Sequence, residues 1–365
     1  SLEFVLNESN CQISDIEHIG VGCLHGVFDE YLPTVMDDIF RYLENDSEAT
    51  ANIRHKIVNS LKRDLDFKDQ FIKQMVELDF KKELITFYEH HTSHISTAFE
   101  PSPFEEAIVV TLDGRGDLKS GTVSIASRKD GIKLLDSNNM LDSVGIFYGF
   151  ITNYLGFKPN RHEGKVTGLA AYGNPEKTIH IFKKLIKWDG KEIVSNLGYY
   201  RPFFTNINPD LINDLKKYSK EDIAAGLQYH CEVIVVKLIK YWIKKINQKN
   251  LSFICLAGGL FANVKINQKI KEIKGVKNIF VFPHMGDGGL TVGAACNLNF
   301  KIFKKSKLKL KNVNFGPSYN DKEIKHYLNK FQKKIYFKKC NNIKNEAVKK
   351  LIEENIINSD QVQKI

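Results

Sequence analysis

The chain has 365 residues, of which 42% are hydrophobic and 11% aromatic, enough to bury a substantial core and better suited to two packed lobes than to one. No apolar run approaches the roughly 18 residues of a membrane helix, and the first residues lack a secretory profile, so we expect a cytoplasmic protein without a membrane partner. Much of the formal charge of +10 comes from lysine-rich stretches near the carboxyl end. No base-stacking or groove-reading motif accompanies this charge, which argues against nucleic-acid binding. Six scattered cysteines without a CxxC pair indicate neither a disulfide framework nor a cysteine zinc site.

The first ninety residues are predicted to be mostly helical, after a short strand near residues 18–23. Apolar side chains recur at helical spacing from Ile53 to Leu84, the pattern expected of an amphipathic helix. Three histidines then fall within five positions, in the segment EHHTSHISTAF that covers residues 89–99.

Two of these histidines have the spacing of a metal-binding pair. His90 and His94 are four residues apart, so on a helix they project from one face at a separation that one ion can bridge, whereas His91 points elsewhere. A zinc-protease helix carries glutamate directly after its first histidine as the general base, and His91 in that position weakens a protease interpretation. An ordinary solvated helix face would show the same spacing, so a third ligand is needed to favour a metal site.

A strand, a glycine-rich turn and a hairpin follow. The hairpin turn is predicted at residues 129–131, between two runs of strand-forming residues. Asp113 ends the first strand with glycine after it, so its carboxylate can meet a ligand phosphate or hydroxyl, or else satisfy the N–H groups of its own turn. Ser143 is expected to cap the next helix, which Gly156 and Pro159 bring to an end.

The segment RHEGKVTGLAAYGNP is predicted to be a loop. Arg161 and Lys165 can hold a phosphate, and Glu163 can orient an amine or a hydroxyl. A charged surface loop is the alternative, but the small residues argue against it, because a plain surface loop seldom needs so close an approach of the backbone. These small residues include Gly164, Gly168, Ala170, Ala171 and Gly173.

Two strand-turn-helix units come next, and glycine is frequent in both turns. Gly258 and Gly259 precede a helix whose free N–H groups suit a phosphate or nucleotide. On that helix, Asn263 and Asn267 either add amide contacts or are exposed polar positions. Alternating strands and helices with glycine-rich turns predict an α/β domain whose ligand lies at the strand ends.

The second unit supplies a candidate third metal ligand. Asp287 follows an apolar strand, between Gly286 and Gly288, where a carboxylate can reach the edge of the sheet. Two imidazoles and one carboxylate leave coordination positions open, which suits a reactive metal such as Fe(II). The alternative is that Asp287 caps the following helix, and sequence alone cannot bring residues 94 and 287 together. After residue 301 the chain is rich in lysine and asparagine, and Asn320 is expected to cap a helix.

Five segments in this order resemble the carbamoyltransferase family of nodulation-factor and antibiotic-tailoring enzymes, over roughly residues 1 to 345. They are HHTSHISTAF, VVTLDGRGD, GIFYGFITNYLGFKPNRHEGKVTGLAAYG, AGGLFANVKINQKI and VFPHMGDGGLTVGAA. The resemblance implies the two-lobed α/β fold of actin, chaperone ATPases and sugar kinases, which is a duplicated RNase H-like fold, here with helical insertions. It also implies kinship with the transferase of tRNA threonylcarbamoyladenosine synthesis, a group once called glycoproteases.

The resemblance also implies a metal site and a reaction. The metal ligands are His90, His94 and Asp287, holding Fe(II) or alternatively zinc. A separate YrdC-like domain makes carbamoyl-adenylate from carbamoyl phosphate and ATP, and this domain transfers the carbamoyl group to a hydroxyl or amine of a sugar-containing acceptor. The metal would hold the phosphate of the adenylate or polarise the carbamoyl carbonyl.

Roles for the other motif residues follow from the same resemblance. Asp113 is the candidate base or orienting carboxylate at the acceptor, and Glu163 and Lys165 are expected near the reacting groups. The residues that are expected to bind the cofactor nucleotide are Gly258, Gly259, Asn263, Gly286 and Gly288.

The chain departs from the family pattern at both ends. The family opens with a hairpin that carries a His-Asp phosphate-loop motif, and its adenylate-forming domain begins with a GPRALG-type motif; neither occurs here. We therefore expect a fragment that lacks the first strands and the YrdC-like domain and cannot complete transfer from carbamoyl phosphate. Its expected parts are a partial first lobe with the HxxxH helix at 1–110, the rest of the transferase core at 111–300 and a basic linker at 301–365.

Three other functions compete with carbamoyl transfer. A sugar or acetate kinase of the same superfamily would use magnesium and leave the HxxxH pair without a role. A metal- or nucleotide-binding module without independent activity is the second alternative, and a glycoprotease, without a general base after its first histidine, is the weakest. The identity of the acceptor sugar stays open, and so does the oligomeric state, with a homo-oligomer as one alternative.

Overall fold

The computed structural model describes residues 2–23, 47–196, 199–200, 208–246, 252–304, 308, 310, 312–331 and 339–354. Two compact units divide the chain, Ser1–Leu310 and Lys311–Ile365. None of the helices in the described ranges is long and apolar enough to cross a membrane.

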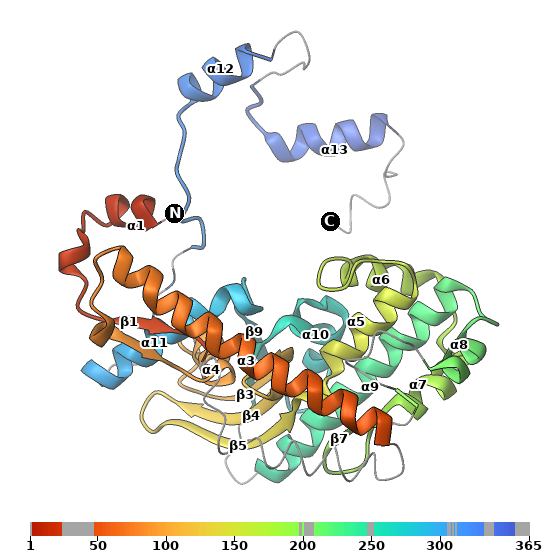
Figure 1. Ribbon diagram of the computed structural model, residues 1–365. Coiled ribbons are helices and arrows are strands. Elements are labelled where there is room, and N and C mark those ends of the chain that lie inside the picture. Colours follow the sequence, from red (N-terminus) through yellow and green to blue (C-terminus); the bar gives the residue numbers. More distant parts are fainter. Residues whose placement is uncertain are drawn as a thin grey trace. The chain divides into compact units, whose positions relative to one another are not determined.

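A mixed five-stranded sheet organises the first unit (Figure 1). Its order is β5-β4-β3-β8-β9; β3 and β5 pair antiparallel with β4, whereas β8 runs parallel to both β3 and β9. The predicted hairpin is confirmed, because β4 ends at Ser127 and β5 begins at Gly131 with a positive φ of 78°. The strands are β3 (Glu106–Gly116), β4 (Lys119–Ser127), β5 (Gly131–Asn139), β8 (Phe253–Ala257) and β9 (Asn278–Val281).

Helices cover both faces of this sheet because the buried strands are apolar on both faces. Along β3, Ile108, Val110 and Leu112 enter the large core with α5 (Val144–Tyr154), α9 (Lys220–Ile246) and α10 (Val264–Lys271). The alternate residues Ala107 and Val109 face Ile95 and Phe99 of α4 (His90–Phe99). Helix α11 (Leu290–Phe303) packs on α4, so the predicted α/β class is confirmed.

The amino-terminal part contains the predicted strand and helix. Strand β1 (Ile19–Val21) pairs parallel with β2 (Ile85–Phe87), after α1 (Leu2–Glu8). Helix α3 (Ser47–Glu77) ends seven residues before Leu84, which corrects the expected limit. The physical reason is Asp79, whose positive φ of 67° is a left-handed conformation that stops a helix.

Of two features predicted for the middle segment, one is confirmed and the other is wrong. Ser143 caps α5 as expected, accepting a hydrogen bond from the backbone N of Ile146 at 3.0 Å. The predicted loop at residues 161–173 is wrong, because residues Glu163–Leu169 form helix α6. Of its glycines, Gly173 does need a close approach, since a Cβ there would lie 2.0 Å from the carbonyl oxygen of Glu221. Gly164 and Gly168 face open space, so the packing argument fails for them.

The remaining elements complete the helical side of the first unit and form the second unit. In the first unit they are α7 (Ile179–Leu185), β6 (Ile186–Trp188), β7 (Ile193–Ser195) and α8 (Pro209–Leu215). In the second unit, Asn320 caps α12 (Asp321–Asn329) as predicted, and α13 (Ile343–Glu353) follows.

Candidate metal centre

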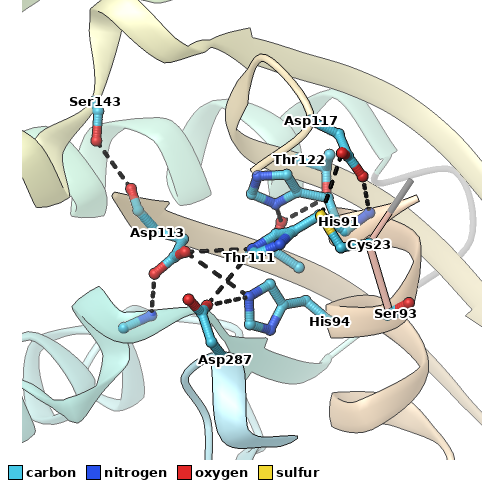
Figure 2. A network of polar contacts seen from close by, with 12 residues as sticks. Cys23, His91, Ser93, His94, Thr111, Asp113, Asp117, Thr122, Ser143 and Asp287 are labelled. Atoms are coloured by element: carbon cyan, nitrogen blue, oxygen red, sulfur yellow. Dashed lines mark hydrogen bonds and ion pairs between the residues drawn. The ribbon is translucent and has the colours of Figure 1, made fainter. Parts of the chain in front are cut away.

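Helix α4 presents both predicted histidines on the side where β3 ends. Its N-cap is Glu89, whose carboxylate accepts a 2.6 Å hydrogen bond from the backbone N of Thr92. His90 is 4% exposed and His94 is fully buried, so the alternative of a solvated helix face is contradicted. His91 is also buried and points away, with its Nδ1 2.8 Å from the Thr111 hydroxyl (Figure 2).

The carboxylates of Asp113 and Asp287 converge on the imidazoles of His90 and His94, and Figure 2 shows both carboxylates beside His94. The His90 Nε2 lies 3.3 Å from Asp113 Oδ2 and 3.6 Å from Asp287 Oδ1. The His94 Nε2 lies 3.9 Å and 3.6 Å from the same two oxygens. All four potential ligand atoms fall within 4.8 Å of one another. We call His90, His94, Asp113 and Asp287 the four-residue cluster.

Tight backbone contacts carry each carboxylate to this position. Asp113 accepts a 2.8 Å bond from the backbone N of Gly259, so β3 and the turn after β8 hold it together. Asp287 opens the turn that leads into α11, and this helix lies against α4 because Gly293 admits it. A Cβ at Gly293 would lie 1.9 Å from the carbonyl oxygen of Ser93. The Thr97 hydroxyl also donates to the Gly289 carbonyl at 2.8 Å.

The electrostatics of the cluster favour a positive charge among its members. Burial lowers the pKa of His90, but its hydrogen bond to Asp113 and the charges of Asp113, Asp287 and Asp117 outweigh burial and raise that pKa overall. Burial raises the pKa of Asp113, yet the His90 bond and the nearby imidazoles outweigh it and lower that pKa. Asp113 therefore stays ionised at neutral pH.

The cluster fits a divalent cation. Both ring nitrogens of the buried His94 have no hydrogen-bond partner among the described residues, a situation that native proteins rarely leave uncompensated. Two imidazoles and two carboxylates form a donor set typical of Fe or Zn, and metal–ligand bonds of about 2.0–2.2 Å suit ligand atoms spaced this closely. Asp287 makes no capping hydrogen bond to α11, so the helix-cap alternative is not observed.

A cleft of about 810 Å³ opens beside the cluster. Asp113 and Asp287 line it, together with six other residues for which the sequence indicated a ligand contact: Arg161, Glu163, Gly259, Asn263, Gly286 and Gly288. Lys165 and Gly258 are not among the lining residues. Gly258 has a positive φ of 98°, and a Cβ there would lie 2.2 Å from the Leu112 carbonyl, so this glycine serves strand packing.

A second polar group forms the helical wall of the cleft, and we call Tyr148, Thr167, Gln228 and Asn263 the amide–hydroxyl cluster. Gln228 Oε1 accepts from the Tyr148 hydroxyl at 2.9 Å and from Asn263 Nδ2 at 2.8 Å. Asn263 Oδ1 caps α10, with the backbone N of Lys265 and of Ile266 each at 3.2 Å. Its amide is thus committed to the protein, although the sequence indicated a ligand contact.

Sequence reasoning missed two features of these clusters. Asp113 was assigned to the acceptor, whereas it lies with the candidate metal ligands. Sequence reasoning did not identify Gln228. The available signal was a polar side chain within the apolar stretch of α9, and in the structure Gln228 is only 6% exposed.

Comparisons with known proteins place this geometry in context. Residues 1–296 match the family model described as carbamoyltransferase N-terminus. Uncharacterized protein MJ1051 of Methanocaldococcus jannaschii is 33% identical over 273 residues, covering 72% of this chain and 50% of that protein. Nodulation protein NolNO of Sinorhizobium fredii is 30% identical over 273 residues, covering 72% of this chain and 38% of that protein.

Among solved structures, T. kodakarensis HypF is similar at 14% identity with a TM-score of 0.34, covering 62% of this chain and 38% of that chain. The chain therefore corresponds to half or less of the length of these relatives.

Proposed function

The chain belongs to the carbamoyltransferase N-terminal family, and on that premise we propose that it is the acceptor-side domain of an ATP-dependent carbamoyltransferase. The carbamoyl group would pass from carbamoyl-adenylate to a hydroxyl or amine of a sugar-containing acceptor. One observation carries this proposal: four potential ligand atoms within 4.8 Å of one another stand beside a cleft large enough for a small molecule.

His90, His94, Asp113 and Asp287 would hold the metal, with Fe(II) favoured by the mixed imidazole and carboxylate donors and zinc as the alternative. When bound, the cation supplies a Lewis acid for a phosphate or carbamoyl oxygen. This assignment moves Asp113 from the role of base to that of ligand. A carboxylate whose pKa is lowered is a poor proton acceptor at neutral pH, which agrees with the change.

The remaining site residues have roles that follow from their places around the cleft. Gly259, Gly286 and Gly288 line it and let a nucleotide phosphate approach the backbone. Glu163 lines the same cleft, and its Oε1 accepts a 2.6 Å bond from the backbone N of Asn160, which orients the carboxylate. We propose that Glu163 orients the acceptor, whereas Lys165 lies outside the lining and would act only after a rearrangement.

The strand order supports the proposed actin-like relationship. In the five-stranded sheet, β4 is antiparallel to its neighbours β3 and β5, whereas β8 and β9 run parallel to β3. This is the arrangement of an RNase H-like half. The separate parallel pair of β1 and β2 would belong to the other lobe.

A single transfer assay tests the proposal. Carbamoyl-adenylate and a panel of sugar acceptors are supplied to the Fe(II)-loaded chain, and carbamoylated product is measured by mass spectrometry. Supplying the adenylate directly makes the assay independent of any adenylate-forming domain. We expect product from the wild type and none from His94→Ala.

Two other results would separate the competing functions. Metal and nucleotide binding without any transfer would leave a binding module without independent activity. Phosphorylated acceptor formed with Mg²⁺ and ATP would instead indicate a kinase, and both results contradict the proposal.

A further inference from the structure

A two-residue turn between β3 and β4 contacts the first turn of α4. Gly116 pairs with Lys119 across this turn, and the two residues between them, Asp117 and Leu118, have positive φ angles of 47° and 63°. Such a turn normally contains asparagine, aspartate or glycine, because other residues rarely adopt these angles. Leucine in this conformation indicates that the surrounding structure holds the turn in place.

Three contacts join the turn to the helix that carries the histidines. Asp117 Oδ2 accepts a 2.7 Å hydrogen bond from the backbone N of His90. Gly116 lies so near the imidazole that a Cβ there would be 2.1 Å from His90 Cγ. The Lys119 ammonium lies 3.5 Å from Oε1 of Glu89, the N-cap of α4.

Asp117 is itself held on its other side. The Cys23 thiol donates to Asp117 Oδ1 at 3.3 Å, so the two carboxylate oxygens have different partners (Figure 2). Asp117 as a whole is 7% exposed, which leaves its carboxylate little freedom to turn away from His90.

We propose that Asp117 is a positioning residue for the metal centre, fixing the orientation of the His90 imidazole through the His90 backbone N–H. The same hairpin then supplies a ligand, Asp113, and the group that aims the opposing ligand at it. Residues that orient ligands without touching the metal commonly change metal affinity by about 10–100-fold when they are removed. This inference rests on the proposed function, because it presumes that the four-residue cluster holds a metal.

A purely structural role makes a different prediction. An acidic side chain at a helix N-terminus stabilises the helix through its dipole and its hydrogen bond. In that case the loss of Asp117 would lower stability without a specific change at the metal. Asp142 provides the matched control: it is also 7% exposed and accepts a 2.7 Å bond from a backbone N, that of Ser195.

The test is titration of the metal-free full-length chain with Co²⁺, followed by visible absorption, beside chemical denaturation of the same samples. Asp117→Ala should weaken Co²⁺ binding about 10–100-fold and alter the ligand-field spectrum. Asp117→Asn keeps an oxygen that can accept the His90 bond and should recover most of the lost affinity. Asp142→Ala should lower stability and leave both the affinity and the spectrum unchanged.

The opposite results are equally clear. Wild-type affinity and spectrum in Asp117→Ala, or an equal loss of affinity in Asp142→Ala, would overturn the positioning role. If Asp117→Ala fails to fold, Asp117→Asn decides the question. A loss of Co²⁺ affinity and a change of spectrum in Asp117→Asn as large as those of a variant of a metal ligand, such as His94→Ala, would also overturn the positioning role. Absence of Co²⁺ binding by the wild type would instead contradict the proposed function itself.

Discussion

Two polar clusters contribute residues to the same cleft, and they differ in whether the protein completes the hydrogen bonds of their buried members. In the amide–hydroxyl cluster, Gln228 uses its oxygen and its nitrogen to bind Tyr148, Asn263 and Glu232. In the four-residue cluster, both nitrogens of His94 have no hydrogen-bond partner in the described part of the chain. The amide–hydroxyl cluster therefore needs no ligand to satisfy Gln228. The four-residue cluster does need one, because a buried polar group without a hydrogen bond costs free energy.

Removing a member of the incomplete cluster should strongly weaken metal binding while the chain still folds. His94→Ala should weaken divalent metal binding by more than about 100-fold, beyond the loss expected for a supporting residue. The metal-free protein should lose stability only through the cavity that the buried ring leaves, since no hydrogen bond to the ring is lost. Metal content by mass spectrometry and denaturation midpoints measure the two effects. His230→Ala, at a buried histidine of α9 outside both clusters, is the control; unchanged metal content in His94→Ala would remove the contrast between the clusters.

Removing the centre of the complete cluster should have the reverse effect. Gln228→Leu keeps the side-chain volume but removes one hydrogen-bond partner from the Tyr148 hydroxyl and one from the Asn263 amide, at a cost of about 2 kcal/mol in the free energy of unfolding. Metal affinity should stay at the wild-type value. Urea denaturation and metal titration measure both quantities. A loss of metal affinity with unchanged stability would mean that the two clusters are not separate.

Two buried histidines, His230 and His90, should change the stability of the metal-free protein in opposite directions as the pH falls. Burial lowers the pKa of His230 to about 4, while its Nε2 bonds the Ile186 carbonyl at 2.7 Å. The unfolded chain therefore takes up this proton first as the pH falls below about 6.5, and stability decreases by at most about 1.4 kcal/mol per pH unit down to about 4. His230→Gln should remove this part of the pH dependence. Parallel wild-type and variant curves, recorded by denaturation in chelator, would contradict it.

For His90 the sign is reversed, because its pKa in the folded protein is raised. Its contribution to the stability of the metal-free protein is present in full below the unfolded value of about 6.5 and is lost as the pH rises through the raised folded value. His90→Gln should therefore be most destabilising in the acidic range and nearly neutral in the alkaline range. The same denaturation series, with metal removed, measures this difference.

The smallest effect should come from the edge of the complete cluster. Tyr148→Phe removes one hydroxyl that bonds Gln228 at 2.9 Å and Thr167 at 2.8 Å, and should lower the unfolding free energy by about 1 kcal/mol. Metal binding should not change. A loss as large as that of Gln228→Leu would show that Tyr148, and not Gln228, is the centre of the cluster.

Local patterns predicted the local elements well. The hairpin before Gly131, the cap at Ser143 and the cap at Asn320 all follow from turn and capping chemistry that acts within a few residues. Helix α6 was missed because its glycines and charges are typical of a loop, and its packing against α9 is a tertiary contact. The Gln228 bonds were equally invisible, since they join α9 to α5 and α10.

By itself the sequence determined the chemistry of the donors: two imidazoles at helical spacing, and aspartates at the ends of strands. Only the tertiary structure decided that His94, Asp113 and Asp287 meet. Their meeting depends on the pairing of β3 with β8 and on the close contact of α11 with α4 at Gly293, between segments almost 200 residues apart. Residue periodicity carries information over one or two turns of chain, whereas this convergence is set by which surfaces bury each other.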